Sequence, residues 1–567
     1  MNIIHYFIAL PFANCLKYKI KNFAPILIIA FIAPMLVACG AGGKGGNNSG
    51  GDNTPPTVTA TPEGSTVISP FEPIQFVFSE PMDQATLAFG GTAGDSMSAL
   101  SDGGVWADEV TLVVSPAPAW QGGIGQTMVI DANDVAGNAM ATFTLTLEVD
   151  DVAPAGTPDI NATIINNGAS IQVVFNESMS PLDLALGGSM AQESDGGVWS
   201  QTALPNDTLT ISPATTWSQN YGANLVVGGS DLVGNPMAPL DLGYTVIGVS
   251  GGIYLVKQTG SDANDGKTPA TAFATISKGL NAASLAGETD AAVLVAGGTY
   301  KPGSSLRMSI DGISLFGGFT GNFRSRFSTL STIDSTGLGA TPTLSINPGL
   351  TAKTILDGFR MIAGNGSNPV GISVSGSVII RNNVVISGVG TASSYGIMVA
   401  NGASPIIVNN TIDGGGGAQT FGIVSSSSSP YIANNIIYNR PPAPAVTRLI
   451  DACIYEPNAV STPTGVENNN LFCNWAYWDS NGAGQVTTEA GVNGLADTVA
   501  GGNIIVDPVF FDPTTNDLQL SPASPVSVTQ GGLNFGDDPT FGFLLDIAGT
   551  PRPGAGLPWS MGAYQAQ

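Results

Sequence analysis

The chain has 567 residues, of which 74 are Gly and 38 are Pro, and its formal net charge is −25. Short runs of Val, Ile, Thr and Ser, broken by Gly, Asn, Asp or Pro, predict a mainly β protein of about three or four domains. We expect no nucleic-acid partner, because phosphate contacts need clustered Lys and Arg. The single histidine, His5, lies in a segment that we expect to be removed, which excludes Ser-His-Asp triads and His-ligated metals.

Residues 1–38 have the pattern of a secretory leader. Basic residues precede an apolar run that is too short to span a membrane, and small residues end the run. The ending Leu36-Val37-Ala38-Cys39 resembles the lipobox of bacterial lipoproteins, which implies that Cys39 is acylated and anchors the protein in the outer membrane, at the cell surface. Ordinary cleavage beside an incidental cysteine is the alternative. Residues 39–56 follow as a flexible Gly-rich tether.

Residues 57–149 and 150–248 repeat one another. The segment Ile74–Met82 matches Ile171–Met179, and each unit contains about seven short alternating segments, as a β-sandwich does. The phrase Phe-(Ser/Asn)-Glu-x-Met with a later Asp-x-x-Gly-Asn resembles the bacterial Ig-like domains of surface-layer and adhesin proteins. The resemblance implies that the two units form a stalk.

The repeated Asp-x-x-Gly-Asn phrase contains two candidate calcium ligands, Asp134 and Asp231. Carboxylate oxygens suit Ca²⁺, and such a site would lie at an interdomain joint. The alternative is that each Asp caps a turn whose Gly and Asn adopt positive φ.

Residues 253–567 have a different pattern. Apolar residues at helical spacing predict a helix over 270–286, before a buried strand at Ala292–Ala296. Short strands then recur with Asn-Asn pairs at steps of about 25 residues, which predicts a solenoid. Stacked Asn side chains can hydrogen-bond between coils, and Asn tolerates a left-handed backbone. The predicted ladder residues are Asn382, Asn383, Asn409, Asn410, Asn434 and Asn435.

The segment Tyr254–Tyr300 and the end of the chain resemble the pectate-lyase-like superfamily of right-handed parallel β-helices. The resemblance covers 253–567 and implies that fold, but it implies little about activity, because one fold hosts many functions. Asp262, Asn264 and Asp265 are further weak calcium candidates, with a capped turn before the helix as the alternative.

An enzyme on this fold would need clustered acids. Within the coils Thr341–Asn439 the only acids are Asp357 and Asp413. Asp357 occupies a ladder position, where a turn role is the simpler interpretation, and Asp413 lies in a different coil. We therefore predict no catalytic residues, and whether the chain is an enzyme stays open.

The segment Arg440–Gly482 is predicted to be an insertion that interrupts the coils. Four of its aromatic residues, clustered toward its end, would suit stacking on sugar rings. The alternative is that these rings cover the side of the solenoid as a small second core. The candidate carbohydrate-binding residues are Phe472, Trp475, Tyr477 and Trp478.

Cys453 and Cys473 are the only thiols left once the leader is removed and Cys39 is acylated. Export to an oxidising compartment favours a disulfide between them. Two buried free thiols are the alternative.

Two classes of function follow from these patterns. The first is a displayed adhesive or carbohydrate-binding lipoprotein, whose partners are a membrane, through the lipid, and a polysaccharide or host surface glycan. The second is a cell-surface polysaccharide lyase or glycoside hydrolase. No cofactor is evident, and Ca²⁺ is the one candidate.

Overall fold

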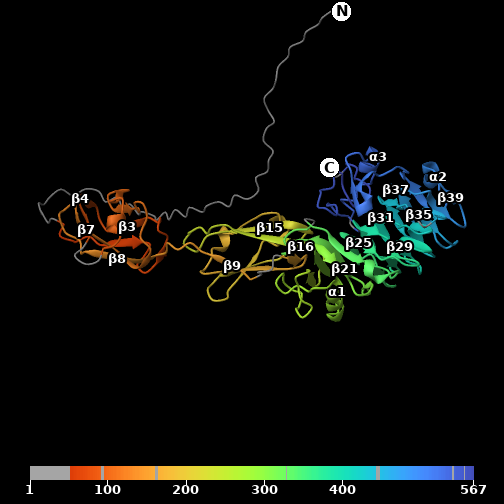
Figure 1. The fold of residues 1–567 in the computed structure, drawn as a ribbon. Helices are drawn as coiled ribbons and strands as arrows, with labels where there is room; N and C mark the ends of the chain where they lie inside the picture. Colours follow the sequence, from red (N-terminus) through yellow and green to blue (C-terminus); the bar gives the residue numbers. More distant parts are fainter. Residues whose placement is uncertain are drawn as a thin grey trace, which may run out of the picture.

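The computed structural model describes residues 52–566 apart from 91–94, 160–163, 327–328, 442–446, 539, 541 and 555. Two β-sandwiches and a parallel β-helix follow one another along the chain (Figure 1). The predicted fold class, mainly β with two Ig-like sandwiches before a β-helix, is confirmed.

The first sandwich contains two four-stranded sheets, β1-β3-β6-β5 and β2-β8-β7-β4. Alternate residues of β3 are buried, and they pack with Trp120 between the sheets. The strands are β1 (Val58–Thr61), β2 (Val67–Ile68), β3 (Ile74–Phe78), β4 (Met82–Phe89), β5 (Val105–Trp106), β6 (Thr111–Val114), β7 (Gly123–Asp134) and β8 (Phe143–Val149).

The second sandwich repeats this arrangement, with sheets β9-β11-β14-β13 and β10-β16-β15-β12. Because the order and the spacing of the strands are the same, the repeat in the sequence is a repeat of the fold. The strands are β9 (Gly156–Pro158), β10 (Ile164–Asn166), β11 (Ile171–Phe175), β12 (Ala185–Gly187), β13 (Val198–Ser200), β14 (Thr208–Ile211), β15 (Asn220–Gly228) and β16 (Leu240–Ile247).

The β-helix has three sheets of mainly parallel strands, and each coil between Ala291 and Asp479 contributes one strand to each sheet. The first sheet contains β17 (Ile253–Val256), β18 (Ala291–Ala296), β21 (Ile313–Phe319), β24 (Ile355–Asp357), β27 (Ile379–Arg381), β30 (Ile406–Val408), β33 (Tyr431–Ala433), β36 (Gly465–Glu467) and β40 (Val499–Gly501). The second sheet contains β19 (Gly298–Tyr300), β22 (Ser331–Ser335), β25 (Phe359–Ala363), β28 (Val384–Ile386), β31 (Thr411–Asp413), β34 (Ile436–Tyr438) and β37 (Asn470–Phe472).

The third sheet contains β20 (Leu306–Met308), β23 (Leu344–Ile346), β26 (Val370–Val374), β29 (Ser393–Val399), β32 (Gln419–Ser425), β35 (Ile450–Glu456), β38 (Trp475–Asp479) and β39 (Gly484–Val486). β39 runs antiparallel to β38, whereas the preceding neighbours in this sheet are parallel. Inward residues of all three sheets form one continuous core.

Helix α1 (Ile276–Leu285) lies at the first end of this core. Its N-cap is Thr275, whose side chain accepts a hydrogen bond from the Lys278 N–H, so the helix begins later than the sequence predicted. Its buried face packs against β17 and β18. The remaining elements lie near the other end and in the C-terminal segment: α2 (Glu489–Asn493), β41 (Phe510–Asp512), β42 (Asp517–Leu520) and α3 (Val526–Thr529).

An asparagine ladder runs along the turn between the first and second sheets. The side-chain oxygen of each ladder residue accepts hydrogen bonds from the backbone and side-chain N–H groups of its neighbour one coil earlier, at 2.9–3.1 Å. Each such bond contributes about 0.5–1.5 kcal/mol net. The ladder consists of Asn383, Asn410, Asn435, Asn469 and Asn503.

The residue before each of four ladder members has a different role, because its backbone makes the turn. Asn382, Asn409, Asn434 and Asn468 have φ angles of 58°, 53°, 56° and 51°. Asn adopts this left-handed conformation at lower cost than most residues. In each predicted pair, therefore, the first asparagine makes the turn and the second forms the ladder.

The prediction that Arg440–Gly482 is an insertion is wrong, because most of this segment forms a further coil. Strands β35, β36, β37 and β38 continue the three sheets in register with the preceding coil. The extra residues lie in two connections of this coil, between Tyr438 and Ile450 and between Glu456 and Gly465. The strands of the coil are regular, and only these two loops are long.

The C-terminal segment packs back along the solenoid. Trp559 lies against Val408 and Ala433 of the first sheet, and Ile547 lies against Val384 of the second. The apolar cluster on the outside of the third sheet, in contrast, contains third-sheet residues alone. Among the described residues, no apolar side chain of another segment joins this outer cluster of the third sheet.

Candidate functional site

A row of aromatic side chains crosses the outer face of the third sheet, and we call it the aromatic row. Tyr395, Phe421, Tyr455 and Trp478 stack in this order, with ring centroids 5.4, 5.0 and 4.3 Å apart. Trp475 lies 5.2 Å from Trp478 and at a steep angle to it. Phe421 is buried, and the other four are half-buried. Parts of four aromatic side chains, which belong to β29, β35 and β38, therefore reach solvent.

The bend of each strand explains why these side chains lie outside. Ile397 is in the core although Tyr395, two residues earlier, is in the outer cluster. Gly396 separates them, and a Cβ there would lie 2.6 Å from the Gly422 carbonyl oxygen of the next coil. Glycine is therefore needed at this close approach, and the alternation of a flat strand does not hold across it.

The four predicted carbohydrate-binding residues do not form one surface. Trp475 and Trp478 belong to the aromatic row. Tyr477 is only 1% exposed and lies in the solenoid core, and Phe472 is exposed on the second sheet. The prediction that all four are exposed together is wrong, because Tyr477 points into the core between two outward tryptophans and Phe472 belongs to a different sheet.

Cys453 and Cys473 are joined by a disulfide, with Cα atoms 5.5 Å apart. Cys453 lies in β35 and points into the core, and Cys473 follows β37. The bond therefore links consecutive coils of the solenoid.

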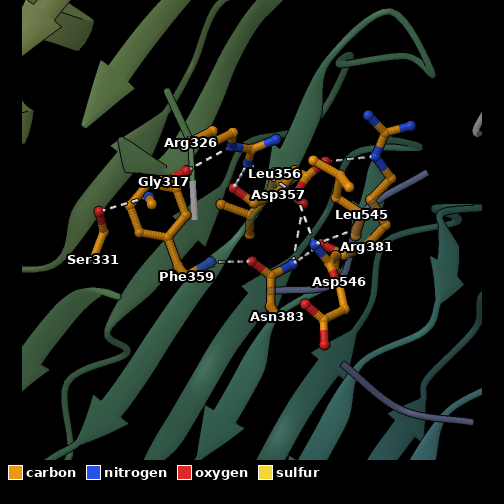
Figure 2. Close-up of polar contacts among 12 residues, drawn as sticks. Gly317, Arg326, Ser331, Leu356, Asp357, Phe359, Arg381, Asn383, Leu545 and Asp546 are labelled. Carbon is orange, nitrogen blue, oxygen red and sulfur yellow. Dashed lines mark hydrogen bonds and ion pairs between the residues drawn. The ribbon is translucent and has the colours of Figure 1, made fainter. Parts of the chain in front are cut away.

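Asp357 joins two buried arginines at the start of the regular coils. Figure 2 shows Asp357 between Arg326, whose Nη2 lies 2.9 Å from one carboxylate oxygen, and Arg381, whose Nε lies 2.8 Å from the other. Burial alone would raise the pKa of Asp357, but the two guanidinium groups hold it below its usual value. The turn role predicted for Asp357 is wrong: Gly358, with a φ of 84°, makes the turn.

This network connects three parts of the chain. Arg326 Nη1 donates to the Tyr221 hydroxyl of the second sandwich at 3.0 Å, and Arg381 Nη1 donates to the Gly542 carbonyl of the C-terminal segment at 2.8 Å. This network could not be predicted from the sequence, because Arg326 lies outside the regular repeats.

Asp413, Glu456 and Asp479 are further buried acids of the coils. Asp413 is 1% exposed and accepts from Arg440 Nε at 2.6 Å. Glu456 and Asp479 are paired at the ends of β35 and β38 and are both buried. Burial, and then the negative charges of Asp479 and Asp497, raise the pKa of Glu456 to about 8.

Two similar carboxylate triads lie in the two sandwiches. Asp52, Glu80 and Asp134 each offer an oxygen within 4.8 Å of the others, and Asp150, Glu177 and Asp231 do the same. Each triad combines an acid before its sandwich with the Glu and the Asp of the repeated phrases. The sequence identified the aspartates but not their partners, because the three acids of a triad are far apart in the chain.

The second triad lies at the joint between the sandwiches. Asn235 Nδ2 donates to the carbonyl of Asp150 at 2.7 Å and to Asp231 at the same distance. Glu177 Oε1 is shielded from solvent and has no hydrogen-bond partner. Burial, and then the charges of Asp150 and Asp231, raise the pKa of Glu177.

The weak calcium candidates before α1 form turns. Asp262 accepts hydrogen bonds from the N–H groups of Ala274 and Thr275, and Asp265 accepts one from the Lys267 N–H. These contacts are those of capped turns, and the described residues bring no third acid to them. Cys39 and the leader lie outside the described residues. No helix within the described parts of the chain is long and apolar enough to cross a membrane.

Comparison with known families gives one match: residues 351–490 match the model of the right handed beta helix region. No curated protein matches the chain. The match covers the coils that contain the asparagine ladder from Asn383 to Asn469, the aromatic row and the disulfide, and it agrees with the parallel sheets.

Solved structures resemble the N-terminal part. A chimeric titin Z1Z2 is 15% identical, with 35% of this chain and 99% of that chain covered and a TM-score of 0.19. The fibronectin(III)-like modules of Clostridium thermocellum CbhA are 9% identical (34% and 94% covered, TM-score 0.18), and domains 4 and 5 of the S-layer protein SbsC are 10% identical (29% and 78% covered, TM-score 0.14). At these scores the likenesses support no functional argument.

Proposed function

We propose that this chain is a surface-displayed carbohydrate-binding protein in which the β-helix binds a glycan and the two sandwiches form its stalk. The observation that carries the proposal is the half-exposed aromatic row on the outer face of the third sheet. Aromatic rings offer an apolar surface to the C–H faces of sugars, and large rigid side chains contribute strongly to binding. Anchoring through Cys39 and the Gly-rich tether, supported by the lipobox-like ending of the leader, is part of this proposal.

The alternative proposal, a polysaccharide lyase or glycoside hydrolase, has less support. Glycosidases in general use two carboxyl groups about 5–9.5 Å apart on either side of the substrate. Asp357 and Asp413 are buried and paired with arginines. These two acids therefore serve the fold, and binding is the better supported function.

The test is a panel of neutral and acidic polysaccharides, screened by affinity electrophoresis with the purified full chain and the double variant Trp475→Ala, Trp478→Ala. We expect at least one glycan to bind and the double variant to lose about tenfold or more in affinity.

Phe472→Ala is the matched control, because it removes an aromatic ring of the same coil from a different face. It should bind as the unchanged chain does. Equal loss in the control, full retention in the double variant, or binding to no glycan would each contradict the proposal.

We also propose that Ca²⁺ binds between the carboxylates of each triad and stiffens the stalk. Three carboxylates are costly to bring together without a cation, and the shielded Oε1 of Glu177 has no donor of its own. Titration calorimetry of the full chain should give two sites for Ca²⁺, and Glu177→Gln should leave one. Saturation at about 100 times Kd adds about 2.7 kcal/mol of stability. Absence of binding, or two sites remaining in the variant, would contradict this proposal.

A further inference from the structure

A pocket of about 640 Å³ lies at the three-way junction of the second sandwich, the first coils and the C-terminal segment. Tyr221 contributes one wall, Arg326 and Arg381 contribute another, and Phe543 and Leu545 close it from the C-terminal side. None of its lining residues belongs to the aromatic row, and nothing in the proposed glycan-binding function uses it.

Among the described residues, the charged side chains that line this pocket are those of two arginines and one aspartate. Asp357 is 1% exposed, and both guanidinium groups are nearly as buried. The lining therefore has one positive charge more than negative. A charge in a surrounding of low dielectric attracts an opposite charge much more strongly than it would in water, so the pocket favours an anion.

The rest of the lining is mostly apolar. The ring of Tyr221 and the side chains of Phe543 and Leu545 face the same space as the arginines, and the Arg381 guanidinium lies 5.2 Å from the Phe543 ring centre. Concave sites with apolar walls and few polar groups are typical of small organic ligands. A bare inorganic anion would leave these walls unused.

We infer that this junction pocket is a binding site for a small organic carboxylate with an apolar body. The carboxylate lies toward Arg326 and Arg381, and the apolar body lies against Tyr221 and Phe543. Because Tyr221 belongs to the second sandwich and Phe543 to the C-terminal segment, the bound molecule contacts both and holds the joint together.

The test uses 2-naphthoate as the probe with the purified full chain, and follows its intrinsic fluorescence on titration. Two controls separate the parts of the inference. 2-Naphthamide has the same body without the charge, and acetate, which competes for the probe, has the charge without the body. We expect saturable binding of naphthoate, and affinities at least about tenfold weaker for the amide and for acetate, since a tenfold change needs only about 1.4 kcal/mol.

Charge changes at the pocket mouth locate the site. Asn220 is exposed and lines the pocket, so Asn220→Glu should weaken naphthoate binding about threefold or more and Asn220→Lys should strengthen it, by the sign of the added charge. Thr215→Glu adds the same negative charge to an exposed position of the same sandwich outside the lining, and it should have little effect. No saturable binding, equal binding of the amide, or no response to either Asn220 variant would overturn the inference.

Discussion

The joint between the two sandwiches and the joint between the second sandwich and the solenoid are held by different interactions. Between the sandwiches, the Asp150–Glu177–Asp231 triad and the hydrogen bonds of Asn235 connect the domains, and the apolar cores of the two sandwiches share no residue. Between the second sandwich and the solenoid, Ile247 packs in one apolar cluster with residues of the first coils.

The difference teaches how each joint responds to its surroundings. The second joint combines apolar burial with charges that are already paired, Arg326 with Asp357, so it needs no added proton or cation to keep its geometry. Like charges in the first joint repel one another unless a proton or a cation neutralises them. The first joint is therefore the adjustable one, and the second is the fixed one.

The largest expected effect comes from Asp357→Asn at the fixed joint. The change leaves Arg326 and Arg381 buried without their shared carboxylate, and removing one partner of a buried ion pair costs about 3–5 kcal/mol. Denaturant unfolding followed by circular dichroism should show this loss in the transition of the solenoid.

Asp334→Asn is the matched control, since Asp334 pairs with the exposed Lys301. Surface pairs contribute at most about 1 kcal/mol, so this variant should unfold nearly as the unchanged chain does. A loss for Asp357→Asn as small as that of the control would mean that the buried network does not hold the joint.

A smaller effect is expected from pH at the adjustable joint, in calcium-free buffer. The pKa of Glu177 is raised in the folded chain, so folding favours the protonated form. Its stabilising contribution is complete below the unfolded pKa near 4.5 and is lost as the pH rises through the folded pKa. Thermal melting of the sandwiches should therefore rise by about 1–3 °C on acidification.

Glu177→Gln removes the titrating group but keeps the shape of the side chain, and it should flatten this dependence on pH. If the variant shows the same pH profile as the unchanged chain, other carboxyl groups govern the first joint. The claim that Glu177 makes this joint sensitive to pH would then be wrong.

Much of the solenoid could be predicted because its repeat is nearly one-dimensional. The recurrence of Asn382-Asn383 at Asn409-Asn410 fixes the turn and the ladder together, because each coil contacts mainly its neighbours. The prediction fails where the loops change length. The step from Asn435 to Asn469 is 34 residues, and a step longer than the usual 25 resembles an interruption of the coils.

Contacts between distant segments could not be predicted in the same way. Arg326 and Asp357 are 31 residues apart, and Gly542 lies 161 residues from Arg381, so no local pattern connects them. The side that an aromatic residue faces also escaped prediction, because the bend at Gly396 breaks strict alternation.

The antiparallel strand β39 has a consequence for how these molecules behave at high concentration. A stack of parallel strands ends in unpaired N–H and C=O groups, which can continue into another molecule and build fibres. In the third sheet, β39 pairs with β38 in the reverse direction, and its side chains do not continue the parallel register. A second copy that meets this end does not find the parallel register there, and this disfavours end-to-end growth through the third sheet.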